Sequence, residues 1–170
     1  MIDRIKRHKV LSQFVRDKCS ENNVAAEVDS GVDSNDYVIV KPDDYYNSLR
    51  RKVPPSVDCL IIQRCVNGGY KITLVELKSI TSMADQTIEN LVGKFETVLT
   101  DFIPKKFKDL LHKDYKAVEL YFVTEIELYR NKNRDIGLKL EALINKRFIY
   151  NQKRYMVQPR MPVPVIKSCY

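Results

Sequence analysis

Two apolar segments joined by a glycine-rich turn constrain the fold of this chain more than any other feature. Residues 57–62 and 70–77 are mostly apolar, and Asn67-Gly68-Gly69 lies between them. Glycine, and to a lesser degree asparagine, adopts the left-handed backbone that tight hairpin turns require. The pattern therefore predicts a β-hairpin.

Hydrophobic periodicity predicts helices and further strands on both sides of this hairpin. A period of three to four residues favours a helix, a short β-branched run favours a strand, and polar clusters favour loops. The expected elements outside the hairpin are a helix over residues 2–19, a loop over 29–36, a strand over 37–40, a loop with one helical turn over 43–55, a helix over 84–102 ended by Pro104, a strand over 117–124, a helix over 135–146, a hairpin or strand pair over 147–157 and an extended tail over 159–170.

This order of elements predicts an α/β protein with a mixed central β-sheet flanked by helices. The chain has 170 residues, which suits one domain over residues 1–170, with 159–170 as its extended tail. Its 44% hydrophobic residues exclude an intrinsically disordered chain. No apolar stretch approaches the roughly 18 residues of a membrane span, and residues 1–9 lack the apolar region of a signal peptide. We therefore expect a cytoplasmic protein without a membrane partner.

The cysteines Cys19, Cys59, Cys65 and Cys169 are scattered, without a C-x-x-C pair. A structural zinc site is not expected, because its ligands usually come in close pairs. Four cysteines could form two disulfides, but a reducing cytoplasm favours free thiols.

Each strand of the predicted hairpin contains one acidic residue, Asp58 in the first and Glu76 in the second. Carboxylates are usually kept out of strand interiors, because desolvating an unpaired charge costs several kcal/mol. Two carboxylates on neighbouring strands also repel each other unless a positive charge lies between them. A divalent cation would supply that charge, and Lys78 points to the same face as Glu76 because side chains at i and i+2 share a face.

A salt bridge between Glu76 and Lys78 at the edge of the sheet is the structural alternative. The acid-x-Lys pattern is short, and it occurs a second time in Asp114-Tyr-Lys116, in a charged connection where we assign it to chance. Glu76-Leu-Lys78 differs because it ends an apolar strand, has an acidic partner across a hairpin and precedes a long helix.

With Asp58, Glu76-Leu-Lys78 and this element order, the chain resembles the PD-(D/E)xK, or restriction-endonuclease-like, nuclease superfamily over roughly residues 1–124. The resemblance implies a restriction-endonuclease-like αβββαβ core and Mg²⁺-dependent hydrolysis of phosphodiester bonds, mostly in DNA, with Mn²⁺ as a substitute metal. The Pro-Asp dipeptide of the family is Val57-Asp58 here, and Pro55 lies three positions before the acid.

The resemblance also implies a role for each motif residue. Asp58 and Glu76 would bind Mg²⁺, and the Leu77 carbonyl would be an added ligand. Lys78 would orient or help to deprotonate the attacking water and offset developing charge. Two alternatives stay open: a nucleic-acid-binding module of the same fold without significant cleavage activity, and an unrelated α/β protein whose basic charge serves solubility.

Four further residues are weaker candidates for the site. The accessory acid of the family would correspond to Glu21 or Glu27, although either could be a solvated surface charge. Gln86 is a candidate polar residue at the start of the long helix, where a plain helix-start role explains it equally well. Ser79 follows the motif lysine and could contact phosphate.

The charge balance favours a polyanionic partner. Lys and Arg number 29 against 22 Asp and Glu, a net charge of +7. We expect nucleic acid, DNA more than RNA, with Arg50, Arg51, Lys153 and Arg154 as leading contacts. A solvated hairpin face explains the basic residues at 153 and 154 equally well. One catalytic centre cuts one strand, so double-strand cleavage would require a homodimer or a partner subunit.

Overall fold

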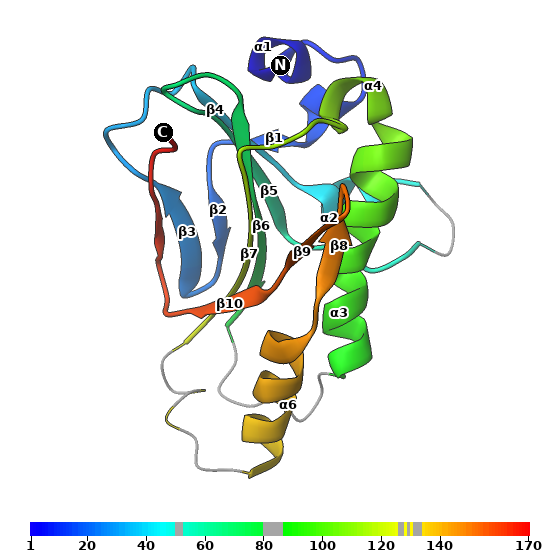
Figure 1. Ribbon diagram of the computed structural model, residues 1–170, viewed down its shortest axis with the longest axis vertical. Coiled ribbons are helices and arrows are strands. Elements are labelled where there is room, and N and C mark those ends of the chain that lie inside the picture. Colours follow the sequence, from blue (N-terminus) through cyan, green and yellow to red (C-terminus); the bar gives the residue numbers. More distant parts are fainter. Residues whose placement is uncertain (50–52, 80–86, 126–127, 129, 131–133) are drawn as a thin grey trace.

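A six-stranded sheet in the order β1-β4-β5-β6-β7-β10 forms the centre of the computed structural model (Figure 1). The structure describes residues 1–49, 53–79, 87–125, 128, 130 and 134–170, without the side chains of 134 and 135. The strands are β1 (Val15–Arg16), β4 (Tyr37–Val40), β5 (Cys59–Arg64), β6 (Tyr70–Lys78), β7 (Ala117–Thr124) and β10 (Val157–Arg160).

The sheet is mixed, as the sequence predicts. Strand β4 pairs with β1 and β5 in antiparallel fashion, and β5 pairs likewise with β6. Strand β7 lies parallel to both β6 and β10. The turn between β5 and β6 places Gly68 and Gly69 at φ values of 79° and 81°, which confirms the predicted glycine-dependent hairpin.

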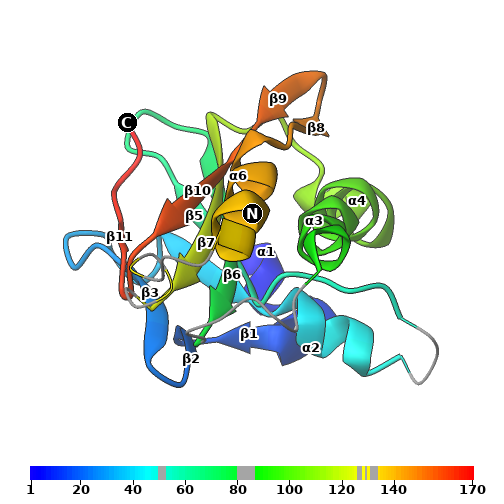
Figure 2. The same ribbon diagram turned by 90° about the horizontal axis from the view of Figure 1, so that it is seen from below.

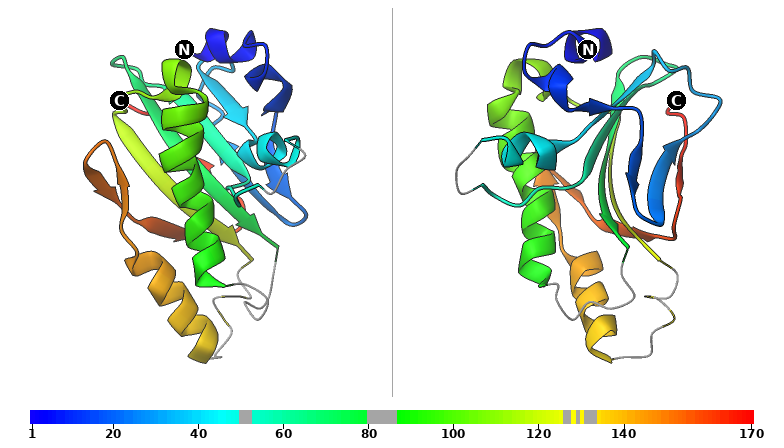
Figure 3. Two further views of the ribbon diagram at one scale, coloured as in Figure 1. Left: turned by 90° about the vertical axis from the view of Figure 1, so that its right-hand side faces the viewer. Right: turned by 180° about the vertical axis from the view of Figure 1, so that it is seen from behind.

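Helices cover one face of this sheet (Figure 3, left). The longest helical segment lies between β6 and the parallel strand β7 in the sequence, and its buried Leu91 and Phe95 belong to the same hydrophobic core as Leu74 of β6. The helical elements are α1 (Ile2–Lys6), η1 (Leu11–Phe14), α2 (Pro42–Asn47), α3 (Ile88–Thr97), η2 (Val98–Lys106), α4 (Lys108–Leu111) and α6 (Arg134–Asn145). Among these described helices, none combines the length and apolar character that crossing a bilayer requires.

Pro104 does not end the long helix, contrary to the prediction. The helix continues past it as the π-helix η2, in which the Phe107 N–H donates to the Phe102 carbonyl. Proline has no N–H to donate and crowds the preceding turn, and the wider π-helical turn is a common way to accommodate such a local misfit.

A second, three-stranded sheet covers the opposite face in the order β11-β3-β2 (Figures 2 and 3). It consists of β2 (Cys19–Glu21), β3 (Val24–Val28) and β11 (Val165–Ile166). The single helix predicted over residues 2–19 is therefore wrong, because only α1 and the short 3-10 helix η1 are helical within it and strands begin at Val15 and Cys19. Its apolar residues have helical spacing, but the β-branched Val15 pairs with Val40 in the central sheet, so tertiary pairing overrides the local pattern.

The extended tail predicted over residues 159–170 is part of both sheets. Strand β10 adds to β7, and β11 adds to β3. These pairings satisfy backbone groups that an isolated tail would leave to water. The predicted hairpin before the tail is confirmed as β8 (Phe148–Tyr150) paired with β9 (Lys153–Tyr155).

The expectation of free thiols is wrong in this structure. Cys19 is bonded to Cys59, and Cys65 to Cys169. The first bond joins β2 to β5, and the second joins the end of β5 to the C-terminal segment, so partners that are 40 and 104 residues apart become neighbours. Pairing of such distant cysteines depends on the packing of the two sheets, which spacing in the sequence does not reveal.

Candidate active site

The register of the β5–β6 hairpin places the two predicted acids opposite each other. Cys59 pairs with Val75, so the next pair toward the open end of the hairpin is Asp58 and Glu76. Both therefore lie on the face of the sheet that α3 covers. Asp58 is fixed there because its Oδ2 accepts a hydrogen bond of 2.7 Å from the Leu77 N–H.

Glu76 is fully buried and lies between two lysine ammonium groups. Its Oε1 accepts from Lys94 Nζ at 2.6 Å and lies 3.1 Å from Lys78 Nζ. Its Oε2 is buried without a hydrogen-bond partner in the part of the chain that the structure describes. Burial, and then the charge of Asp58, raise the pKa of Glu76 to about 7, although both lysines act to lower it.

Lys94 is a site residue that the sequence analysis missed. It comes from α3, which buries Leu91 and Phe95, and the next buried residue is Val98 at the start of η2. Lys94 lies three residues after Leu91 and four before Val98, so it belongs to the same helical face. A lysine inside the apolar stripe of a helix is the signal that could have identified it, because such a charge needs a buried partner.

The ammonium of Lys78 remains charged in this arrangement. Burial alone would lower its pKa, but the carboxylates of Glu76, Asp58 and Glu21 raise it above the ordinary lysine value. Of the two acids Glu21 and Glu27, Glu21, at the end of β2, is thus the one whose charge reaches Lys78. Glu27 lies exposed on β3, where its backbone N–H donates to the Pro164 carbonyl, and no described contact joins it to the site.

A third acid, Asp43, lies close enough for its ionisation to depend on Asp58. It belongs to α2, and its Oδ1 is buried without a hydrogen-bond partner among the described residues. Burial raises its pKa, Lys41 lowers it in part, and the charge of Asp58 raises it again. Even so, no described group of three or more His, Cys, Asp or Glu side chains is close enough to form a metal cluster.

The weaker candidates from the sequence lie elsewhere. Ser79 donates a hydrogen bond of 2.5 Å to Glu125 Oε1, next to the site. Lys153 and Arg154 are exposed on β9, and Lys153 lies 3.5 Å from Asp114. Asp114 precedes the first residue of β7, whereas Lys78 pairs with the last residue of that strand, so the β9 pair lies at the opposite end of the sheet from the site.

The accessory candidate Gln86 and the predicted nucleic-acid contacts Arg50 and Arg51 lie outside the described residues.

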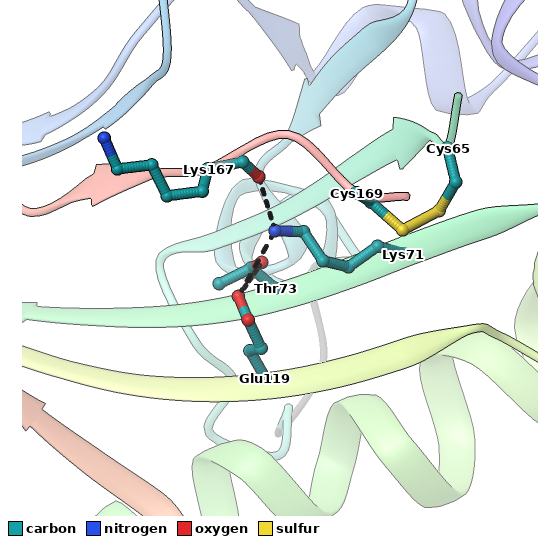
Figure 4. Close-up of a disulfide and its surroundings, with 6 residues drawn as sticks. All are labelled: Cys65, Lys71, Thr73, Glu119, Lys167 and Cys169. Atoms are coloured by element: carbon teal, nitrogen blue, oxygen red, sulfur yellow. Dashed lines mark hydrogen bonds and ion pairs between the residues drawn. A yellow bond between two sulfur atoms is a disulfide. The ribbon is translucent and has the colours of Figure 1, made fainter. Parts of the chain in front are cut away.

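A second acid–lysine cluster occupies the other face of the same strands (Figure 4). Lys71 Nζ donates to the Lys167 carbonyl at 2.7 Å and lies 3.5 Å from Glu119 Oε2. The same oxygen accepts from Thr73 Oγ1 at 3.2 Å and from the Tyr121 hydroxyl at 3.0 Å. Lys71 Nζ and Glu119 Oε2 therefore both have partners within the protein.

Comparison with known proteins gives no relative for this chain: no family model, curated protein or solved structure matches it. The chemistry of the site is therefore argued from its own donors. Two carboxylates, one with a buried and unpartnered oxygen, are the oxygen ligands that a small hard cation requires. The residues present thus fit Mg²⁺, which usually binds through one or two carboxylates together with waters and substrate phosphate.

Proposed function

We propose that this protein is a Mg²⁺-dependent nuclease that hydrolyses phosphodiester bonds, most readily in DNA. The observation that carries the proposal is the buried Glu76 carboxylate. It lies beside Asp58 on the adjacent strand, keeps Oε2 unpartnered among the described residues and has two ammonium groups at Oε1. A carboxylate that serves only stability would be expected to satisfy both oxygens, because an unpartnered buried acceptor costs about 1–3 kcal/mol.

Asp58 and Glu76 would hold the metal. Bound Mg²⁺ supplies charge neutralisation at the scissile phosphate. The hydrogen bond from the Leu77 N–H already orients the Asp58 carboxylate and fixes it at the open end of the hairpin. Leu77 is thereby held beside the acids, in keeping with the added ligand that the resemblance implies.

Lys78 and Lys94 would have different roles in the reaction. Lys78 keeps its proton because three carboxylates raise its pKa, so it would orient the attacking water and offset developing charge as a cation and not accept a proton as a base. Lys94, with the shorter contact to Oε1, would fix the rotamer of Glu76 as a positioning residue.

The arrangement of strands supports a restriction-endonuclease-like core as part of this proposal. Helix α1 precedes the antiparallel strands β4, β5 and β6, and α3 then leads to β7, which is parallel to β6. This is the αβββαβ order that the motif resemblance implies. Strands β1 and β10 and the small sheet would be additions to that core.

A nucleic-acid-binding module without cleavage activity is the second candidate. The observation in its favour is the Lys94 contact of 2.6 Å, which neutralises Glu76 without any metal. In that case the acids would serve the fold, and added Mg²⁺ would change neither the substrate nor the affinity for it.

Incubation of the purified protein with supercoiled plasmid, duplex DNA, single-stranded DNA and RNA of matched sequence tests the proposal. We expect cleavage with Mg²⁺ or Mn²⁺ and none in EDTA. Lys146→Ala is the matched control for Lys78→Ala, because Lys146 pairs with Glu96 on the surface at 3.4 Å. Cleavage that persists in EDTA or in Asp58→Ala would overturn the assignment, and unchanged substrates under all metal conditions would favour the binding module.

A further inference from the structure

The end of the molecule opposite the candidate active site carries a concentration of exposed positive charge. Residues 3–9 contain four basic residues and one acid, and residues 105–109 contain three basic residues and one acid. We call these two segments together the basic end. Its exposed basic side chains are Arg4, Lys6, Arg7, Lys9, Lys105, Lys106 and Lys108.

The fold brings the two segments of the basic end together, although about a hundred positions separate them in the sequence. The ring of His8 packs edge-on against Phe107 with centroids 5.7 Å apart. Figures 1 and 3 show α1 beside the top of the η2–α4 segment. A hollow at this junction is lined by His8, by the three lysines at 105, 106 and 108, by one acid, Asp109, and by Phe107 and Leu110. The positive charge therefore forms one surface.

Local acids do not neutralise this surface. Asp101 lies 3.9 Å from both Lys105 and Lys106, so one carboxylate is shared by two ammonium groups. Asp101 also accepts a hydrogen bond of 2.7 Å from the Tyr46 hydroxyl, which anchors it to the helix layer. The side chain of Lys105 remains 69% exposed despite its long contact, so its charge is available to a partner.

The pKa of the Met1 amino group is also affected by positive charges around the basic end. Burial lowers its pKa, and the charges of Arg64, Arg4 and Lys113 lower it further against the opposing effect of Asp3. Arg64 is the last residue of β5, and Lys113 lies in the segment before β7. These two segments therefore add positive charge around α1.

A single helical segment links the basic end to the candidate active site. Lys94 of α3 contacts Glu76, and Lys105 lies eleven residues further along the continuous α3–η2 segment. At about 1.5 Å per residue or slightly less, the two positions are on the order of 15 Å apart along the axis. That length corresponds to about four or five nucleotide steps of roughly 3.4 Å.

We propose that the basic end binds the phosphate backbone of nucleic acid several nucleotides to one side of the bond that is cut. The choice of nucleic acid as the polyanion rests on the proposed function, but the binding itself requires no metal and no cleavage. The surface would set the register of a long substrate on the protein. A substrate shorter than about five nucleotides on that side would lose these contacts.

The test measures affinity for a fluorescent 30-mer duplex in EDTA over a range of salt concentrations. We expect Lys105→Glu combined with Lys108→Glu to weaken binding about tenfold or more near physiological salt and to reduce the slope of log K against log salt by about two. The matched control is Lys18→Glu combined with Lys167→Glu, an equal charge change at two exposed positions beside the small sheet. It should change affinity far less, and thermal unfolding of both double variants should stay close to that of the wild type, since the four residues are exposed.

Equal weakening by the two double variants would overturn the proposal, because net charge alone would then explain binding. Unchanged affinity in the Lys105/Lys108 variant would overturn it as well. Metal-dependent cleavage is scored separately with the same proteins. If the basic-end variant binds weakly while the wild type never cleaves, the binding surface stands and the nuclease assignment fails. If the wild type cleaves and both variants bind alike, the nuclease assignment stands and the binding surface fails.

Discussion

The central sheet buries an acid–lysine cluster on each of its faces, and the two clusters differ in how completely they are satisfied. On the face covered by the small sheet, Glu119 Oε2 accepts from Thr73 and Tyr121 and lies 3.5 Å from Lys71. On the face covered by helices, two lysines share Oε1 of Glu76, and its Oε2 is buried without a partner among the described residues.

Burial sharpens this contrast. The side chain of Glu119 is 27% exposed, whereas that of Glu76 is fully buried. The more deeply buried carboxylate is thus the one with the poorer internal hydrogen bonding. Buried polar groups are normally paired, and an exception calls for an explanation such as a missing ion or water. The comparison indicates that the Glu119 cluster stabilises the fold and that the Glu76 cluster serves a ligand.

Neutralising the two acids should separate these roles most clearly. Glu76→Gln keeps the shape of the side chain but removes a metal ligand, so we expect the rate of plasmid cleavage with Mg²⁺ to fall by about a thousandfold or more, since several kcal/mol of metal stabilisation is lost. Glu119→Gln is the control on the opposite face and should cleave at nearly the wild-type rate. Equal losses in the two variants would remove the distinction between the faces.

The two lysines beside these acids provide the next comparison. Lys78→Ala should lower the cleavage rate by roughly 10²–10³-fold while leaving affinity for DNA in EDTA within a few-fold of the wild type, because its charge orients the attacking water and offsets developing charge. Lys71→Ala should leave the rate per folded molecule unchanged. Single-turnover cleavage, with the folded fraction measured by circular dichroism, checks both, and full activity of Lys78→Ala would withdraw its role.

Stability should respond in the opposite sense. Lys71→Ala leaves Glu119 without its buried cation and leaves the Lys167 carbonyl without a donor, so we expect a loss of about 2 kcal/mol in the free energy of unfolding. This is below the 3–5 kcal/mol of a fully buried pair because Glu119 is partly exposed. Urea denaturation measures it. A loss below about 0.5 kcal/mol would mean that this pair contributes little to the fold.

The pH dependence of stability in EDTA gives a further comparison. The pKa of Glu76 is raised to about 7 from its ordinary value of 4.5, so the folded protein binds this proton more tightly than the unfolded chain does. The resulting stabilisation is complete below pH 4.5 and is lost as pH rises through about 7. The stability difference between wild type and Glu76→Gln should therefore shift against the wild type across this window. A difference that stays constant from pH 4.5 to 8 would contradict it.

The sequence predicts the central hairpin and the strand at Ala117–Thr124 because their apolar runs and turn residues act locally. It also predicts the facing of Asp58 and Glu76, since strand alternation and hairpin register follow from the same pattern. The position of Lys94 depends on how α3 packs on the sheet, which is a tertiary property. The roles of these residues remain predictions.

Contacts between distant segments account for the rest of what the sequence does not reveal. The disulfide Cys65–Cys169 and the pairing of β11 with β3 join segments that are more than a hundred residues apart. The first strands, β1 and β2, form where the local spacing of apolar residues favours a helix. For β1, β11 and the disulfide, the energy that decides comes from partners far along the chain. Strand β2 instead pairs with the adjacent strand β3.

Binding of Mn²⁺ measured by electron paramagnetic resonance, in the presence of a cleavage-resistant phosphorothioate duplex, tests the central claim most directly. The wild type and Glu119→Gln should remove free Mn²⁺ from solution with the same affinity, and Glu76→Gln should bind at least tenfold more weakly because a carboxylate ligand is missing. Binding of Mn²⁺ by Glu76→Gln with the affinity of the wild type would contradict the assignment of the helix-covered cluster as the metal site.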